Sequence, residues 1–356
     1  MKLGLLFSIL LLCPLTQTFS AEMPDFFGSF RYRYERIDQD GSEIRNRQRI
    51  KASLGLKSHI DDKFKYTFSL ISGSTDPVSG NVTLDSAASS KGINIDQAEF
   101  SYTTPWKFTV GGGKMKNPFY RPGKTELIWD GDLRPEGLTL NHHHKADKWS
   151  LKSTYAHYEL EERSAASDTT MDGIQLLATF KMENVKLKLG GSLFEFSHIK
   201  DRATLFDTTS SFGNTVTSSS TYATGFTIQE LMLVVETKIG GLPVSVFADF
   251  VTNDDANDDE KASLYGFSVG KAKKANSWKF SYNYRKVELD AVLGVFTDSD
   301  FKGGGTDGKG HELGFKYAMT DHSSLGLTQF INETSIKTPS SSQDYNRTQL
   351  DFNLKF

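Results

Sequence analysis

Apolar and polar side chains alternate at the end of this chain up to its final residue. The apolar members are Leu350, Phe352, Leu354 and Phe356, and polar residues stand between them. Neighbouring side chains of a β-strand point to opposite faces, so a period of two predicts a strand with one apolar and one polar face. The same period recurs at residues 106–110, 149–155 and 278–285. Because helical spacing is almost absent, we expect an all-β protein.

The apolar residues beyond residue 20 are too dispersed for a membrane-spanning helix. No uninterrupted apolar run there reaches the roughly eighteen residues that such a helix needs. Any segment that crosses a membrane must therefore be a strand, and strands cross only as a closed barrel. Alternation alone fits two folds, because the apolar face would meet a protein core in a soluble sandwich and lipid in a transmembrane barrel.

The lengths of the links between the predicted strands favour the barrel. Short links fall at 58–62, 103–105, 145–148, 182–184, 239–242, 272–277 and 320–321. Long polar links fall between them, at 38–44, 73–92, 114–132, 160–170, 197–225, 253–260, 288–308 and 334–344. Bacterial outer-membrane barrels alternate short periplasmic turns with long external loops in this way. We therefore predict a transmembrane antiparallel up-and-down β-barrel of about sixteen strands, with both chain ends on the periplasmic side.

The start of the chain is typical of an exported protein. A basic Lys2 precedes an apolar run at 3–15, and small residues follow at Thr18 and Ser20. This pattern predicts a secretory signal peptide over residues 1–20, followed by a single barrel domain over residues 21–356. The one cysteine, Cys13, falls within the signal peptide. The mature protein is then free of cysteine and cannot depend on disulfides.

The predicted export and fold place the protein in the cell outer membrane. There we expect outer-membrane lipid and lipopolysaccharide as its surroundings. The final aromatic residue, Phe356, is typical of the strand that outer-membrane proteins present to the barrel-assembly machinery. The formal net charge is −3, which is too close to neutral for a nucleic-acid partner.

Basic residues gather on the polar face of the first three predicted strands. They are Arg31, Arg33, Arg45, Arg47, Arg49, Lys51, Lys63 and Lys65. A charge in lipid costs a few kcal/mol near the midplane, so in a barrel this polar face would line the lumen. One interpretation is a selectivity surface that attracts anions. The other is a solvated wall whose charges balance acidic loops.

An acidic link could face this basic wall. The link at 114–132 carries Glu126, Asp130 and Asp132 and is the third external loop by order. If this link folds inward, it would form an acidic constriction with a transverse electric field that favours small dipolar solutes. The channel would then show little preference between anions and cations. If the link stays outside, the wall predicts a mild preference for anions. Both arrangements remain open at this point.

Several segments resemble one known family, the Putative porin family of Gram-negative outer membranes, a family of general-porin-like β-barrels. They lie at 115–119, 129–133, 135–137, 287–291, 298–301 and 304–311. The resemblance implies a water-filled channel for passive diffusion of ions and small hydrophilic solutes, with no catalytic residues and no cofactor. By analogy with general porins of this size, it also implies a homotrimer.

Barrel proteins with two other functions would show the same strand pattern. A plugged barrel with a structural or adhesive role would differ only in conductance, although about sixteen strands usually leave an aqueous channel. A barrel hydrolase would need a serine, a histidine and an acid or amide, for which Asn141, His142 and a nearby serine are the candidates. No nucleophile motif accompanies them, so we expect no enzyme. His142 and His144 lack an identifiable third ligand, so no metal is expected.

Overall fold

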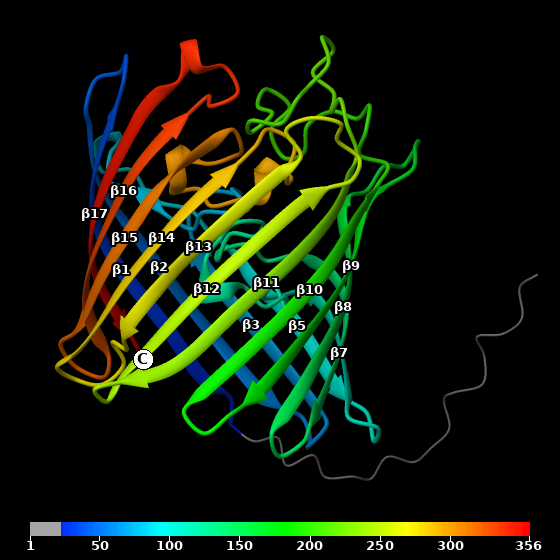
Figure 1. Cartoon of the computed structure of the whole chain (residues 1–356), viewed down its shortest axis with the longest axis vertical. Coiled ribbons are helices and arrows are strands. Elements are labelled where there is room, and N and C mark those ends of the chain that lie inside the picture. The colour runs from blue at the N-terminus through cyan, green and yellow to red at the C-terminus, as the bar shows by residue number, and fades with distance from the viewer. Residues whose placement is uncertain (1–22) are drawn as a thin grey trace, which may run out of the picture.

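The computed structural model describes residues 23–356, and in this range the chain forms a tilted, closed barrel of antiparallel strands (Figure 1). The strands are β1 (Asp25–Gln39), β2 (Arg45–His59), β3 (Phe64–Ser72), β4 (Val82–Thr83), β5 (Ile93–Thr103), β6 (Phe108–Lys114), β7 (Glu136–Lys145), β8 (Trp149–Glu161), β9 (Thr169–Lys181), β10 (Val185–Ser197), β11 (Phe226–Ile239), β12 (Leu242–Asn253), β13 (Lys261–Gly270), β14 (Ser277–Val287), β15 (Gly308–Ala318), β16 (Ser323–Thr334) and β17 (Gln343–Lys355). The predicted signal peptide lies outside the described residues.

The barrel closes between its first and last strands. β1 pairs with β2 on one side and with β17 on the other, and Tyr32 stands opposite Phe352 in the second pairing. All strands except β4 belong to the closed ring, which gives the sixteen-stranded barrel that the sequence predicts. The extra strand β4 is two residues long and pairs with β2 beyond the end of β3.

The two faces of each strand differ as the alternation predicts. On β1, Phe30, Tyr32 and Tyr34 point outward and are more than a third exposed, whereas Arg33 and Glu35 point inward and are buried. A soluble protein would reverse this arrangement, because water would surround its outer surface. Here the apolar side chains form the outer surface, as lipid requires, and the charged side chains find partners in the lumen.

The links alternate between the two ends of the barrel. Seven turns lie at the end that holds both strand termini Asp25 and Lys355, at 60–63, 104–107, 146–148, 182–184, 240–241, 271–276 and 319–322. Loops at the opposite, external end lie at 40–44, 73–92, 115–135, 162–168, 198–225, 254–260, 288–307 and 335–342. The predicted alternation is confirmed. Four loops matter below and are called L2 (73–92), L3 (115–135), L5 (198–225) and L7 (288–307).

The only helices in residues 23–356 are single 3₁₀ turns: η1 (Ser86–Ala88), η2 (Pro122–Lys124), η3 (Gly294–Phe296), η4 (Phe301–Gly303) and η5 (Pro339–Ser341). None of the helices in this range is long and apolar enough to cross a lipid bilayer.

A hydrophobic core lies inside the barrel, on one side of it. It joins Trp129 of L3, Tyr222 of L5 and Val292 of L7 to inward-facing wall residues such as Phe194 and Leu264. Loops that covered a polar part of the inner wall would remove water from its polar side chains, which costs free energy. The loops therefore cover the part of the wall that carries apolar side chains. The lumen is thus packed along β8–β14, and its charged wall lies across from this core.

Candidate functional site in the lumen

L3 is fastened to the inner wall of the barrel by backbone and side-chain contacts. The Tyr120 backbone N–H donates to Gln175 Oε1 at 2.6 Å, and Gln175 Nε2 donates to the Tyr120 carbonyl at 3.1 Å. Lys152 Nζ donates to the Pro118 carbonyl at 3.0 Å. Beside these bonds, the Phe119 ring meets Phe194 edge to face with centroids 4.8 Å apart. L3 therefore lies within the barrel rather than outside it.

L7 also enters the lumen and binds L3. The Asp130 backbone N–H donates to the Phe296 carbonyl at 2.8 Å, and the Ser299 backbone N–H donates to Asp130 Oδ2 at 3.1 Å. The Ser299 hydroxyl donates to the Val78 carbonyl of L2 at 3.2 Å. Three loops that are distant in the sequence thus meet beside the tip of L7.

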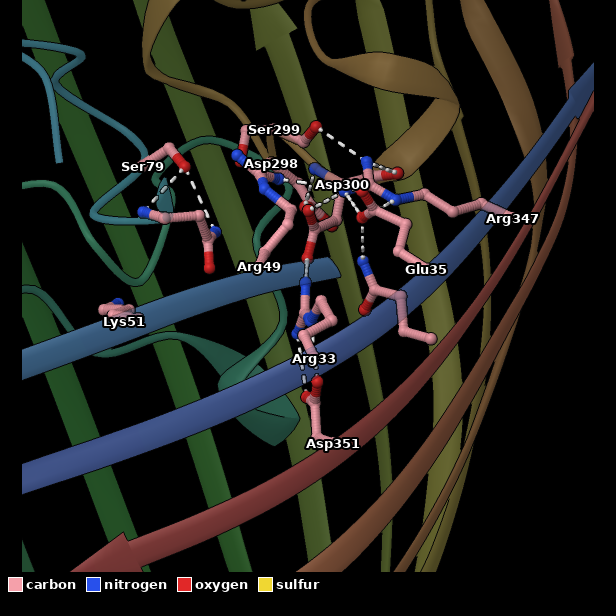
Figure 2. Close-up of polar contacts among 12 residues, drawn as sticks. Arg33, Glu35, Arg49, Lys51, Ser79, Asp298, Ser299, Asp300, Arg347 and Asp351 are labelled. Atoms are coloured by element: carbon pink, nitrogen blue, oxygen red, sulfur yellow. Dashed lines mark hydrogen bonds and ion pairs between the residues drawn. The ribbon is translucent and has the colours of Figure 1, made fainter. Parts of the chain in front are cut away.

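The tip of L7 reaches the charged wall through Asp300 (Figure 2). Arg33 Nη1 of β1 lies 2.9 Å from Asp300 Oδ2, and Arg347 Nη2 of β17 lies 2.7 Å from Asp300 Oδ1. Arg33 also forms a two-pronged pair with Asp351, at 2.7 and 2.8 Å. Arg347 pairs in addition with Glu35, which is fully buried. Burial raises the pKa of Asp300, but Arg347 and Arg33 outweigh this and hold that pKa well below its usual range.

The structure brings six of the eight predicted basic residues together. Arg31 stands opposite Lys51 and Arg33 opposite Arg49 in the β1–β2 register, and Arg45 and Arg47 continue the row toward the external end. Like charges directly opposite each other repel, so this patch needs carboxylates or dissolved anions beside it. Lys63 and Lys65 lie apart. Lys63 is in the periplasmic turn 60–63 rather than on β3, and Lys65 is exposed near that end of the barrel.

The three predicted acidic residues divide between two partners. Asp132 pairs with Lys51 of the wall, and although burial raises the pKa of Asp132, Lys51 lowers it overall. Glu126 and Asp130 instead face Asp298 of L7, with oxygen atoms of all three residues within 4.8 Å of one another. Burial, followed by repulsion from the neighbouring carboxylates, raises the pKa of both Glu126 and Asp130.

Two cavities flank the tip of L7. One, of about 470 Å³, opens toward the external end and is lined by Arg45, Arg47, Arg49 and Arg347 among others. The other, of about 260 Å³, is lined by residues that include Arg33, Arg285 and Glu126. Asp300 lines both cavities. Its carboxylate therefore stands between them.

Sequence reasoning missed several members of this site. Glu35 and Arg285 were not singled out because nothing in the local pattern marks them, although Arg47 and Asp298 lie only 12 and 13 positions away. Arg347 was missed because its partner Glu35 lies 312 positions away. Arg285 is buried and lies 2.7 Å from Asp298. Asp298 and Asp300 lie in one of the segments that carry the family resemblance.

The candidate residues for a hydrolase do not assemble. Asn141 and His142 are neighbours on β7 and therefore point to opposite faces. Asn141 accepts a hydrogen bond from the Thr154 hydroxyl at 3.0 Å. The His142 ring stacks on Phe108, with centroids 4.7 Å apart, on the outward face that also carries Leu140 and Leu138.

Comparison with solved structures finds the same fold in outer-membrane proteins. OprB of Pseudomonas putida, in a structure at high pH, superposes with a TM-score of 0.64 and 9% identity over 94% of each chain. OmpF of Salmonella typhi in complex with daunomycin gives 0.58 and 9%, over 94% of this chain and 97% of that one. A mutant of Vibrio cholerae OmpT, an outer-membrane protein, that lacks loop L8 gives 0.54 and 14%, over 94% and 99%.

Comparison by sequence identifies the family. No curated protein matches the chain significantly. The sequence profile of the family described as "Putative porin" matches residues 33–240 and 215–356, which together span most of the chain. This chain therefore belongs to the Putative porin family and is a β-barrel protein of the cell outer membrane.

Proposed function

We propose that the protein is a porin for passive diffusion of ions and small hydrophilic solutes, and that its narrowest part favours anions. The observation that carries this proposal is the charge of the wall across from the L3–L5–L7 core. Six cations there, Arg31, Arg33, Arg47, Arg49, Lys51 and Arg347, contact or adjoin four carboxylates, Glu35, Asp132, Asp300 and Asp351. An excess of two positive charges remains at the passage.

The position of L3 does not cancel this excess. An inward acidic loop was expected to leave little ion preference, but of its three acidic residues only Asp132 contacts the wall. Glu126 and Asp130 face L7 and are buried, and their raised pKa values mean that they carry less negative charge than free carboxylates. We propose that L3 and L7 together form the constriction, with L7 supplying Asp300 and L3 supplying Asp132.

Replacing Arg45, Arg47 and Arg49 together by glutamine tests this proposal. These side chains line the external cavity, so their removal should shift the reversal potential in a salt gradient toward cations. The measurement is zero-current potential in a planar lipid bilayer. Lys63→Gln with Lys65→Gln is the control, because both lysines lie apart from the cavity. A triple variant with the potential of the unaltered protein would rule out anion selection by this wall.

The assembly and surroundings of the porin follow from the same proposal. A trimeric form is described for Vibrio cholerae OmpT, with which this chain shares its fold, and we propose a homotrimer here. We also propose that the barrel-assembly machinery recognises β17 and Phe356, and that lipopolysaccharide surrounds the external half. Light scattering of the purified protein distinguishes a trimer from a monomer.

A second candidate, a plugged barrel, draws support from the hydrophobic core inside the lumen. That core covers only the β8–β14 side of the described barrel, however, and the two cavities remain beside the charged wall. A barrel that inserts into a bilayer without conducting would favour this alternative.

A further inference from the structure

The Asp300 carboxylate is held in the way that a protein holds a bound carboxylate ligand. Arg33 and Arg347 approach its two oxygen atoms separately, at 2.9 and 2.7 Å, from neighbouring strands of the wall (Figure 2). The contact from Arg33 is a charge-assisted hydrogen bond and that from Arg347 is an ion pair, and guanidinium groups suit carboxylates in particular. We call the two arginines, with Arg31 and Arg49 beside them, the arginine cup.

The arginine cup carries more positive charge than its permanent partners neutralise. Arg33 is paired with Asp351. Arg347 is paired with Glu35, and Glu35 also pairs with Arg47 and Arg49. Arg31 and Arg49 interact electrostatically with Asp300, and each has a buried Nε without a hydrogen-bond partner. If Asp300 withdrew, Arg31 would have no carboxylate of residues 23–356 in contact and Glu35 alone would be shared by Arg47, Arg49 and Arg347, so the cluster would attract another anion.

The arginine cup lies where a solute would meet it. Asp300 lines both the external cavity and the second cavity, so an anion that moved from one to the other would meet this residue. The wall cations Arg45 and Arg47 lead from the external end toward the cup. A row of cations of this kind raises the local concentration of anions and guides their diffusion toward the cup.

The tip of L7 is built so that it could move. Gly303 and Gly304 follow Asp300 closely, with φ angles of +89° and +102°, and a Cβ on Gly304 would meet nothing closer than 3.6 Å. Gly305 instead packs against the Phe212 carbonyl and fixes the far end of this segment. Glycine adopts many backbone conformations without strain. The remaining bonds from Arg347 to the Ser299 and Asp300 carbonyls are long, at 3.3 Å each.

We infer that the arginine cup is a binding site for small carboxylate solutes, that Asp300 occupies it in the resting channel, and that a solute carboxylate displaces Asp300 as it passes. The inference rests on the proposed porin function and names the solute class that the pore prefers. In the unaltered protein the cup is free only while Asp300 is detached. The apparent affinity for the solute is lowered by that fraction.

Asp300→Asn tests the displacement, with sodium succinate as the probe. The variant removes the competing charge and nearly keeps the shape, so succinate should block half of the chloride current at a concentration about tenfold lower than in the unaltered channel. Asp258→Asn is the matched control, because it makes the same change on the exposed loop 254–260 and should leave the block unchanged. Succinamide, the neutral analogue, should not block either channel. Equal block of the Asp300 variant and the unaltered protein, or block by succinamide, would refute the inference.

Two further measurements test the arginine cup independently of the proposed porin function. If no variant conducts, the porin proposal fails, yet calorimetry on the detergent-solubilised protein still measures succinate binding, which should be tighter in Asp300→Asn. Absence of succinate binding in that variant refutes the proposed binding site.

If Asp300→Asn does not fold, the unaltered protein suffices for a test by proteolysis. Succinate should increase tryptic cleavage after the half-buried Lys302 of L7, and succinamide should not. Cleavage that succinate leaves unchanged counts against displacement.

Discussion

Arg33 illustrates how a single residue is constrained in this barrel. It is buried and satisfies two carboxylates from different parts of the chain, Asp300 and Asp351. Removing one partner of such a cluster leaves charges without compensation, which typically costs about 3 kcal/mol or more. Arg33→Gln should therefore lower the free energy of unfolding in urea by that order. Arg36→Gln, which removes an exposed pair with Asp38, should change it by less than about 1 kcal/mol. Similar losses in both variants would contradict the assigned network.

The buried carboxyl groups between L3 and L7 predict a dependence on pH. Because burial and mutual repulsion raise the pKa of Glu126 and Asp130 in the folded protein, the folded state binds protons more tightly than the unfolded state. Their contribution to stability is fully present below the unfolded pKa values of 4.5 and 3.8, and it is lost as the pH rises toward the folded values. The groups that face them are Asp298, Asp132, Arg121 and Arg285.

Asp130→Asn removes one of these protons and with it part of the pH dependence. The melting temperature of the unaltered protein should therefore fall more steeply between pH 4 and pH 9 than that of the variant. Comparison of the two slopes cancels the contribution of groups common to both. Parallel slopes would mean that Asp130 is ionised at neutral pH.

The contact between Asp300 and the wall should respond differently to pH. Because the pKa of Asp300 is lowered, this contact should stay intact until the pH falls well below 3.8.

At the scale of the strand, the seam between β1 and β17 is the element most dependent on one small residue. The Phe356 ring covers Gly28, and a Cβ on Gly28 would lie 2.3 Å from that ring. Two backbone hydrogen bonds join the same residues, at 3.1 and 3.2 Å. A side chain at this position would displace the final aromatic ring and would also lie within 2.9 Å of the Ser53 carbonyl oxygen.

Gly28→Val should displace Phe356 and hinder closure of the barrel. Overpacking of this kind costs about 1–3 kcal/mol. Electrophoresis of unheated samples measures the fraction of protein that migrates as the folded barrel, and this fraction should fall in the variant. Gly191→Val is the control, since Gly191 faces outward on β10 and a Cβ there would meet nothing closer than 3.6 Å. If both variants fold equally well, the terminal ring does not help to close the seam.

The strands could be predicted from the sequence because their signal is local. The turn at 182–184 and the loop at 73–92 agree with the structure to the residue, since alternation stops where a strand stops. L3 was predicted to end at 132 but continues to 135, because Leu133 is buried with the lumenal core before β7 begins. β4 was not predicted. Its two residues acquire strand geometry only by pairing with Arg49 and Ile50 of β2.

The site was less predictable, because its geometry depends on contacts between distant residues. The basic residues of β1 and β2 could be recognised from their spacing. Their partners could not: Arg347 and Glu35 are 312 positions apart, and Asp300 reaches Arg33 across 267 positions. The sequence also left the position of L3 open, since nothing local to the loop states whether it folds inward.

Viewed as a whole, the molecule has a lumen with two unlike sides. Three loops pack a hydrophobic core onto β8–β14, and the wall formed by β17, β1 and β2 stays polar and charged. In the proposed porin, a solute would be confined to a passage along the arginines, where its charge is sensed at short range. Selectivity in this account is a property of the asymmetric lumen and not of any one residue.

The most direct test of the account is the current through the purified, refolded protein in a planar bilayer under a potassium chloride gradient. An anion-selective porin should show stepwise openings and a reversal potential displaced in the direction that indicates chloride preference. A barrel that inserts and stays silent, or one whose reversal potential indicates potassium preference, would contradict this account.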